Sequence, residues 1–465
     1  MTTLQNGPTV RPTDTETSTP GQPYRALPGL TETPGRWLHG WQPESAAQWR
    51  AGGRQVARVN LAVSVFAEFL GFAVWAIWSI VVPQLPAAGF ALTVDQMFWL
   101  VSVPSLVGAT LRIPYTFAVP RFGGRNWTIV SALLLLVPAL GLAWVVNHPQ
   151  AGFGVLLLVA ALAGVGGGNF ASSMANISFF YPETEKGKAL GLNAAGGNLG
   201  TAAVQLAVPL IITAGAGIAL DRAGLVFIPF ALLAALLAWR LMHNVADAKA
   251  DARSFAAAIR VRHTWLLSFL YIGTFGSFIG YSGAFPTLLK SQFPEMGLSI
   301  AFLGALVGSL ARPLGGVLAD RMGGGVVTVA SFAAMIAGAG GVILGLRAHS
   351  FGLFFGAFLW LFVFTGVGNG SIYRMIPAVF SATAADRSPS GLLAAKRTAA
   401  GCIGIAGAIG AFGGFLIPRG FALSTTAAGS IVPAIGVFIG AYAVMTAVTW
   451  AVYCRRAGAL GSGVI

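Results

Sequence analysis

The chain alternates between long apolar stretches and short polar connections over most of its length. Twelve apolar stretches, each near the roughly 20 residues that a bilayer-spanning helix needs, lie at residues 60–82, 96–120, 126–146, 152–180, 187–213, 223–241, 264–286, 297–319, 326–346, 352–375, 398–418 and 429–453. The strands of a membrane barrel would be shorter and would alternate apolar with polar residues. The pattern therefore predicts an all-α polytopic membrane protein with twelve transmembrane helices.

The polar connections divide these stretches into two equal groups. The longest interior one, residues 242–263, follows the sixth stretch and is the natural linker between two halves. The polar start of the chain, rich in Thr, Pro and Gly, is typical of a disordered tail. We therefore expect five regions: a largely disordered tail at 1–58, a six-helix half at 59–241, a linker at 242–263, a second six-helix half at 264–453, and a tail at 454–465.

Charge is scarce and unevenly placed. The chain is 56% hydrophobic and 9% charged, whereas a soluble domain has about 25% charged residues. Its net charge of +14 could suggest nucleic acid as a partner, but most of the 28 Lys and Arg fall in the tails and in connections on one side of the expected membrane. The cations in connections on the other side are Arg222, Lys290, Arg347 and Arg419. This asymmetry predicts that both termini and the linker are cytoplasmic, in a multi-pass protein of the inner membrane that contacts lipid and no nucleic acid.

Two stretches of the chain repeat one pattern. ATLRIPYTFAVPRFGGR (109–125) and LARPLGGVLADRMGGG (310–325) each place an arginine, Arg112 or Arg312, inside an apolar run, with a basic glycine-rich turn at the same interval beyond it. An arginine inside a span costs about 2.5–3.5 kcal/mol on insertion scales, so each must face a cavity or a partner. Two like charges at matching depth on facing halves predict an anion between them, because guanidinium suits planar oxyanions. The alternative is that each arginine snorkels or binds backbone carbonyls.

Glycine-rich segments also repeat between the halves, as in GVGGGN (164–169) and GVGNGS (366–371). Small residues let helices approach closely and leave spans able to bend. We expect these conformational roles for Gly164, Gly166, Gly167, Gly168, Gly366, Gly368, Gly407 and Gly410.

Longer motifs carry a family resemblance that runs from about residue 60 to residue 455. GVGGGNFASSMANISFFYP (164–182) and GLNAAGGNLG (191–200) resemble the nitrate signature of the NarK-type nitrate/nitrite porters. YIGTFGSFIGYSGAF (271–285) and AIGAFGGFLIPRGF (408–421) agree with the same family in order. The resemblance implies the major facilitator fold, with two pseudo-symmetric six-helix halves and the substrate bound near the midplane between them. The turn RFGGR lacks the acidic residue usual in that superfamily.

The resemblance also implies a substrate site. By its motifs, Arg112 and Arg312 would clamp the planar anion, Phe170 and Phe275 would lie against its two faces, and Tyr271 and Asn198 would hydrogen-bond near it. Apolar ring faces favour a weakly hydrated planar ion, while neutral amide and hydroxyl groups supply donors. Without the resemblance, ordinary helix packing would be the favoured explanation for the three aromatic residues.

One residue departs from the family pattern: Glu68 in the first predicted span. An intramembrane carboxylate is a functional hypothesis by default. Two mechanisms therefore stay open. Nitrate/nitrite antiport would follow if the empty pair of arginines resists closure, because like charges repel in a low dielectric. Proton-coupled nitrate or nitrite symport would follow if Glu68 titrates, and the carboxylate could instead pair with an arginine and tune the clamp.

Other classes of function have less support. A channel would need a continuous pore, and a nitrate sensor would need an output domain. An enzyme would need a catalytic set, yet the five His are scattered without metal-ligand spacing. Cys402 and Cys454 fit apolar filling. We expect a monomeric transporter of nitrate and nitrite that uses no cofactor or metal.

Overall fold

The computed structural model describes residues 27–215, 217–248 and 252–455. Before the linker the longer helices are α2 (Arg54–Val81), α3 (Val94–Phe122), α4 (Gly124–Leu134), α5 (Leu136–Val145), α6 (Gly152–Leu162), α7 (Gly164–Phe180), α8 (Glu183–Ile212) and α10 (Phe227–Leu241), with the short α9 at Asp221–Leu225. After it come α11 (Ala252–Arg260), α12 (Arg262–Tyr271), η5 (Ile272–Gly276), α13 (Ser277–Gln292), α14 (Phe302–Met322), α15 (Gly324–Arg347), α16 (Phe351–Ala382), α17 (Pro389–Ala411), α18 (Gly413–Ala428) and α19 (Val432–Thr449).

Several shorter elements join these helices. They are β1 (Thr31–Thr33), β2 (Trp37–His39), α1 (Ala46–Gln48), η1 (Trp49–Gly53), η2 (Val82–Gln84), η3 (Pro86–Ala88), η4 (Pro149–Ala151), β3 (Asn244–Val245), η6 (Leu298–Ile300) and η7 (Trp450–Cys454). The predicted third span is α4 and α5 joined at a bend, where Pro138 lacks the N–H that would continue the helix ladder.

Eleven segments of the described residues are long and apolar enough to cross a bilayer. The predicted seventh span is not among them. It is nevertheless one unbroken helical segment, α12–η5–α13, whose Ser, Thr and Tyr side chains lower its hydropathy. With this segment included, the helices match the twelve predicted stretches in order, and the fold class expected from the sequence is confirmed.

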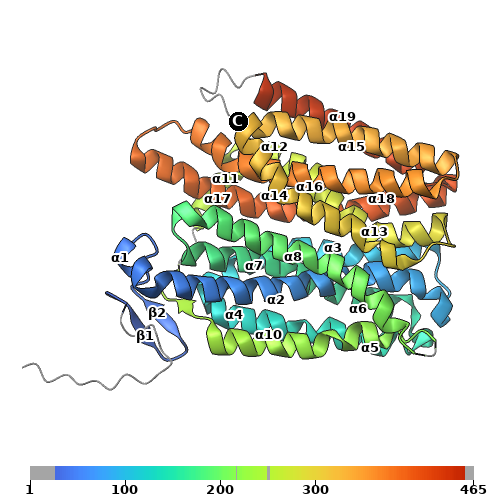
Figure 1. Ribbon diagram of the computed structural model, residues 1–465, viewed down its shortest axis with the longest axis horizontal. Helices are drawn as coiled ribbons and strands as arrows, with labels where there is room; N and C mark the ends of the chain where they lie inside the picture. Colours follow the sequence, from blue (N-terminus) through green and yellow to red (C-terminus); the bar gives the residue numbers. More distant parts are fainter. Residues whose placement is uncertain (1–26, 216, 249–251, 456–465) are drawn as a thin grey trace, which may run out of the picture.

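The helices form two bundles packed lengthwise against each other. Figure 1 shows α2–α10 (blue to green) in one bundle and α12–α19 (yellow to red) in the other. The bundles meet through the helix pairs α3–α18, α3–α17, α8–α14 and α2–α13. The N-terminal strands and the linker lie at one end of the molecule, here called the linker end.

Equivalent turns close the linker end of each bundle, between α3 and α4 and between α14 and α15. Gly123 has φ of 86° and Gly323 has φ of 89°. These left-handed values favour glycine, since a Cβ would clash with the backbone. The two halves therefore share the same backbone turn, as their similar glycine-rich sequences predict.

Part of the predicted tail is folded. β1 pairs antiparallel with β2, and β2 pairs parallel with β3 of the linker. The Trp41 indole donates to the Phe179 carbonyl oxygen at 3.1 Å and packs on Phe180. The first long helix, α2, also begins at Arg54, before the expected boundary at residue 58. Burial of Leu38 and Trp41 against the first bundle orders this segment, a long-range contact that the polar composition did not indicate. The disorder expected for residues 1–26 falls outside the described residues.

Candidate functional site

A cavity of about 300 Å³ runs between the two bundles from the linker end. α11 and the middle turns of α17 line its mouth, where Phe255 contacts Phe117 of α3 at 5.6 Å between ring centroids. Arg112, Phe170 and Gly407 line its deep end. The cavity therefore leads from the linker end to the first of the two arginines that the sequence singled out.

Both bundles hold Arg112. Its Nε donates to the Gly167 carbonyl oxygen at 3.2 Å within the first bundle, and its Nη1 donates to the Gly407 carbonyl oxygen at 2.7 Å in the second. Its Cζ lies 4.5 Å from the Phe170 ring centroid and 5.1 Å from that of Phe275. The side chain is 1% exposed. The carbonyl contacts that the sequence left as an alternative thus exist, but they use only part of the guanidinium.

Each arginine has a buried nitrogen without a hydrogen-bond partner among the described residues. These nitrogens are Arg112 Nη2 and Arg312 Nη1. Arg312 lies on α14, with its Cζ 5.3 Å from the Tyr373 ring. A buried donor without a partner is rare in native proteins and calls for an explanation. The arrangement leaves two charged donors, one from each bundle, for an anion.

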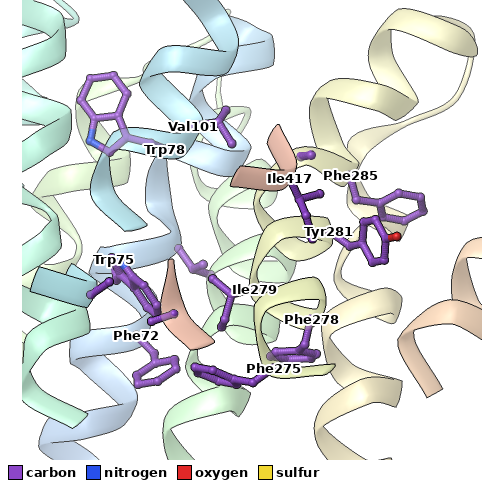
Figure 2. Close-up of a cluster of buried hydrophobic side chains, with 14 of the residues drawn as sticks. Phe72, Trp75, Trp78, Val101, Phe275, Phe278, Ile279, Tyr281, Phe285 and Ile417 are labelled. Atoms are coloured by element: carbon purple, nitrogen blue, oxygen red, sulfur yellow. The ribbon is translucent and has the colours of Figure 1, made fainter. Parts of the chain in front are cut away.

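Three of the predicted aromatic residues form one layer beside Arg112. The Phe170 and Phe275 rings lie 6.4 Å apart at 29°, and Tyr271 stacks on Phe275 at 5.2 Å. Phe72 and Trp75 extend the layer on α2, and Figure 2 shows Phe72 beside Phe275. The structure therefore brings Phe170, Phe275 and Tyr271 together with Arg112, as the resemblance implied.

Asn198 lies on α8 in the same bundle as Arg112. It is buried, and its Oδ1 has no partner among the described residues. An amide oxygen repels an anion, whereas an amide nitrogen can donate a hydrogen bond to it. Asn198 would therefore bind an anion only with its side-chain amide rotated by 180°, so that the nitrogen takes the place of the oxygen.

Glu68 is fully buried between α2 and α8. Its Oε2 accepts a hydrogen bond from Asn193 Nδ2 at 2.7 Å, and the same amide nitrogen donates to Ser173 at 2.8 Å. Among the described residues Glu68 forms no ion pair, although Arg112 and Arg312 act on it electrostatically. Its Oε1 is likewise without a partner there. The carboxyl group is thus held by the neutral amide of Asn193, within electrostatic reach of the arginines.

Most of the singled-out glycines lie where helices touch. A Cβ at Gly167 would come 2.5 Å from Trp75, and Gly166 packs directly on the backbone of Gly71. The corresponding contacts of the other close-packed glycines are Gly164 on Val107, Gly168 on Leu111, Gly366 on Gly308, Gly368 on Thr274 and Gly410 on Tyr271. Gly407 differs, since a Cβ there would only reach 3.9 Å from Arg112 Nη1. It faces the site rather than a neighbouring helix.

Sequence reasoning missed several residues of this region. Trp75, Asn193, Ser173 and Tyr373 contact the predicted site residues, and the Gly407 carbonyl was not recognised as an acceptor. Tyr373 could have been found, because it follows the repeated GVGNGS motif by less than one helical turn. The carbonyl could not, since every residue carries one.

The end opposite the linker is closed by contacts between the bundles. Arg419 on α18 forms an ion pair with Asp95 on α3 at 2.8 Å and lies 4.2 Å from the Trp99 ring. Gln205 Nε2 on α8 donates to the Ser282 carbonyl oxygen on α13 at 2.7 Å. Between these contacts and the site lies an apolar cluster that includes Val101, Ile279 and Ile417 (Figure 2). The site is therefore reached from the linker end and shut off from the other.

Comparisons with known proteins agree with this architecture. The model of the Major Facilitator Superfamily matches residues 64–414. The nitrate/nitrite transporter NarU of Salmonella typhimurium is 40% identical over 445 residues, which cover 90% of this chain and 96% of NarU. The probable nitrate/nitrite antiporter NarK2 of Thermus thermophilus is 36% identical over 454 residues, which cover 92% of this chain and 98% of NarK2.

Solved structures match the fold at lower identity. A D-xylose-proton symporter superposes with a TM-score of 0.66 at 16% identity, over 85% of this chain and 97% of that chain. The xylose transporter XylE from E. coli, in a partially occluded inward open conformation, gives 0.65 at 14% identity, over 86% and 99%. At this identity the likeness concerns the fold alone.

Two bundles with a central cavity, the matching family model and these relatives define the class: the chain belongs to the Major Facilitator Superfamily, as a multi-pass membrane transporter. Within that superfamily it is a member of the NarK-type nitrate/nitrite porter family. The resemblance read from the sequence motifs is confirmed.

Proposed function

We propose that this transporter exchanges nitrate and nitrite by alternating access, with the anion held between Arg112 and Arg312. The observation that carries the proposal is the pair of buried guanidinium nitrogens, one on each bundle, without partners among the described residues. Nitrate and nitrite are planar monoanions with oxygen acceptors, which match the planar donor fork of arginine. The names of the relatives support the same two anions.

The linker end is the cytoplasmic side in this proposal, and both termini are cytoplasmic in the inner membrane. The support is the asymmetry of charge, since most Lys and Arg lie in the tails, the linker and the turns at that end. The cavity that leads to Arg112 then opens to the cytoplasm. The Asp95–Arg419 ion pair and the Gln205 hydrogen bond hold the outer side closed and must break when the carrier turns outward.

Exchange follows from the electrostatics of the two arginines. Without an anion, closing the cavity would bring two unscreened positive charges into a low dielectric, where they repel strongly. A bound monoanion attracts both guanidiniums and offsets part of that repulsion. The loaded carrier can then reorient, while the empty carrier resists doing so, which gives one-for-one exchange.

Proton-coupled uptake is the second candidate, and a specific observation favours it: Glu68 is fully buried near both arginines. In the empty carrier an ionised Glu68 would offset part of the positive charge of the two arginines. In the loaded carrier Glu68 would be protonated and neutral, and the bound anion would offset that charge instead. Asn193 and Ser173 would hold the carboxyl group in place throughout. Empty-carrier return would then be possible, and net uptake would follow the proton gradient.

The test is uptake of labelled nitrate into proteoliposomes loaded with nitrite, nitrate or neither, with and without an inward proton gradient. Exchange predicts uptake only into loaded vesicles, whatever the gradient, and the same behaviour in Glu68→Gln. Symport predicts gradient-driven uptake into empty vesicles that Glu68→Gln abolishes. Failure of the wild-type protein to move either anion under any of these conditions would contradict both.

A further inference from the structure

Two polar groups on α16 are buried beside the proposed site without hydrogen-bond partners among the described residues. Asn369 is 1% exposed, and both its Oδ1 and its Nδ2 are unpaired. The Tyr373 hydroxyl is buried and unpaired as well. Buried amides and hydroxyls are almost always hydrogen-bonded in native proteins, so unpaired atoms gathered at one place point to a ligand that completes them.

Helix geometry places both groups toward the arginines. Asn369 and Tyr373 are four residues apart on α16 and therefore share one face of the helix. The Tyr373 ring lies 5.3 Å from Arg312 Cζ, 6.4 Å from the Tyr271 ring, and lines the cavity. Gly370, between them in sequence, packs directly on the backbone carbonyl of Arg312. α16 thus passes Arg312 at the level of Asn369 and Tyr373.

The donors without partners at this level can be matched to an anion. They include Arg112 Nη2, Arg312 Nη1, Asn369 Nδ2 and the Tyr373 hydroxyl. If each arginine takes one oxygen, two oxygens are bound, which is all that nitrite has. Nitrate carries a third oxygen, which would stay unpaired in a buried site unless further donors met it. Asn369 and Tyr373 supply such donors from the second bundle.

We propose that Asn369 and Tyr373 are further anion-binding residues, which bind the third oxygen of nitrate and so set the preference of the site for nitrate over nitrite. The proposal rests on the proposed function, since it assumes that both anions enter between the two arginines. Nitrite has no third oxygen, so it would leave the Asn369 and Tyr373 donors unpaired. A polar site discriminates strongly against a ligand that leaves its buried polar groups unpaired.

The test compares Tyr373→Phe and Asn369→Leu with the wild-type protein in exchange assays that give KM separately for nitrate and for nitrite. Each variant removes donors while nearly keeping side-chain size. We expect the KM for nitrate to rise about tenfold or more, the usual effect of losing one hydrogen bond to a charged ligand. The KM for nitrite should change less than about twofold in the same proteins.

Tyr281→Phe is the matched control. Tyr281 is a buried tyrosine of the same bundle, but its hydroxyl is hydrogen-bonded to Tyr442 at 2.6 Å. The Tyr281→Phe substitution should leave the ratio of the KM for nitrate to the KM for nitrite unchanged. If Asn369→Leu does not fold, Asn369→Ala replaces it, and protection of each purified variant by nitrate or nitrite against thermal unfolding reports binding without turnover.

The outcomes separate this inference from the proposed function. An unchanged nitrate-to-nitrite ratio in both variants overturns it, whether the two KM values stay normal or rise together, because Asn369 and Tyr373 would then be structural. A wild-type protein that exchanges neither anion contradicts the proposed function instead.

Discussion

Arg112 and Arg312 occupy equivalent positions in the two bundles but have different surroundings. Arg112 donates to carbonyls of both bundles and lies against the rings of Trp75, Phe170 and Phe275. Among the described residues, Tyr373 is the one whose ring lies within cation–π distance of Arg312, at 5.3 Å. A repeated sequence therefore does not give a symmetric site. The first bundle supplies a guanidinium held in one orientation, and the second supplies one with fewer described contacts.

The same asymmetry appears at the linker end. In the second bundle Asp320 of α14 forms an ion pair with Arg374 of α16. The first bundle has Pro120 at the position that corresponds to Asp320. There Arg125 donates to the carbonyl oxygens of Trp239 at 2.9 Å and of Gly35 at 3.3 Å, and the strands of the N-terminal segment cover the turn. At the linker end, an ion pair between two helices stabilises the second bundle, whereas contacts with the folded N-terminal segment stabilise the first.

The largest effects are expected at the arginines. Arg112→Lys and Arg312→Lys should each nearly abolish nitrate exchange, because lysine keeps the charge but loses the planar fork. We expect a loss of about a hundredfold or more in each, and the larger loss in Arg112→Lys, which also loses carbonyl contacts. Initial rates in proteoliposomes measure this, and Arg321→Lys in the exposed turn is the control. Near-normal exchange by either Arg112→Lys or Arg312→Lys would contradict the proposal that these two arginines hold the anion.

The N-terminal segment should contribute measurably to the stability of the first bundle. Trp41→Ala removes a buried indole and its bond to Phe179, and we expect a loss of about 3 kcal/mol in the free energy of unfolding. Thermal unfolding in detergent measures it. Trp144→Ala, at a half-exposed tryptophan, is the control. Equal unfolding temperatures for Trp41→Ala and the wild-type protein would mean that the segment is only loosely attached.

Low pH should also destabilise the contact between the N-terminal segment and the linker. Burial and the nearby Arg36 and Arg125 lower the pKa of His243 to about 3, from 6.5. Its neutral ring accepts from Arg36 Nη2 at 2.8 Å. Below pH 6.5 the unfolded chain binds a proton that the folded chain does not, so this contribution to stability is complete above pH 6.5 and falls as the pH drops toward 3.

The measurement for His243 is the unfolding temperature as a function of pH. We expect a decrease between about pH 7 and about pH 5 that is weaker in His243→Asn. His148→Asn, at a partly buried histidine in another connection of the chain, is the control. A slope that is identical in all three proteins would show that His243 titrates normally in the folded state.

The smallest effect is expected at the charge pair of the second bundle. Asp320→Asn removes the ion pair with Arg374, but both side chains are about half exposed, and such pairs contribute about 0–1 kcal/mol. The unfolding temperature should hardly change, in contrast to Trp41→Ala. A loss as large as that of Trp41→Ala would mean that the two bundles depend equally on their linker-end contacts.

Much of this protein could be predicted from local sequence patterns. The long apolar stretches specify helices, because a bilayer leaves no other way to pair the backbone groups of a single span. The repeated arginines and glycine turns specify two related bundles, and the glycines at 123 and 323 fit the left-handed backbone there. The family motifs placed Arg112, Phe170, Phe275 and Tyr271 in one region, where the structure has them.

The tertiary structure decided what depends on contacts between distant segments. Gly407 accepts from Arg112 through a carbonyl that no side chain marks, and residues 27–53 fold because linker and first-bundle residues bury Leu38 and Trp41. The sequence motif GVGNGS marks the neighbourhood of Asn369 and Tyr373, but only the structure shows that their polar atoms are buried without partners among the described residues. Hydrophobic periodicity is local and can be read along the chain, whereas hydrogen-bond satisfaction depends on where the whole chain places each atom.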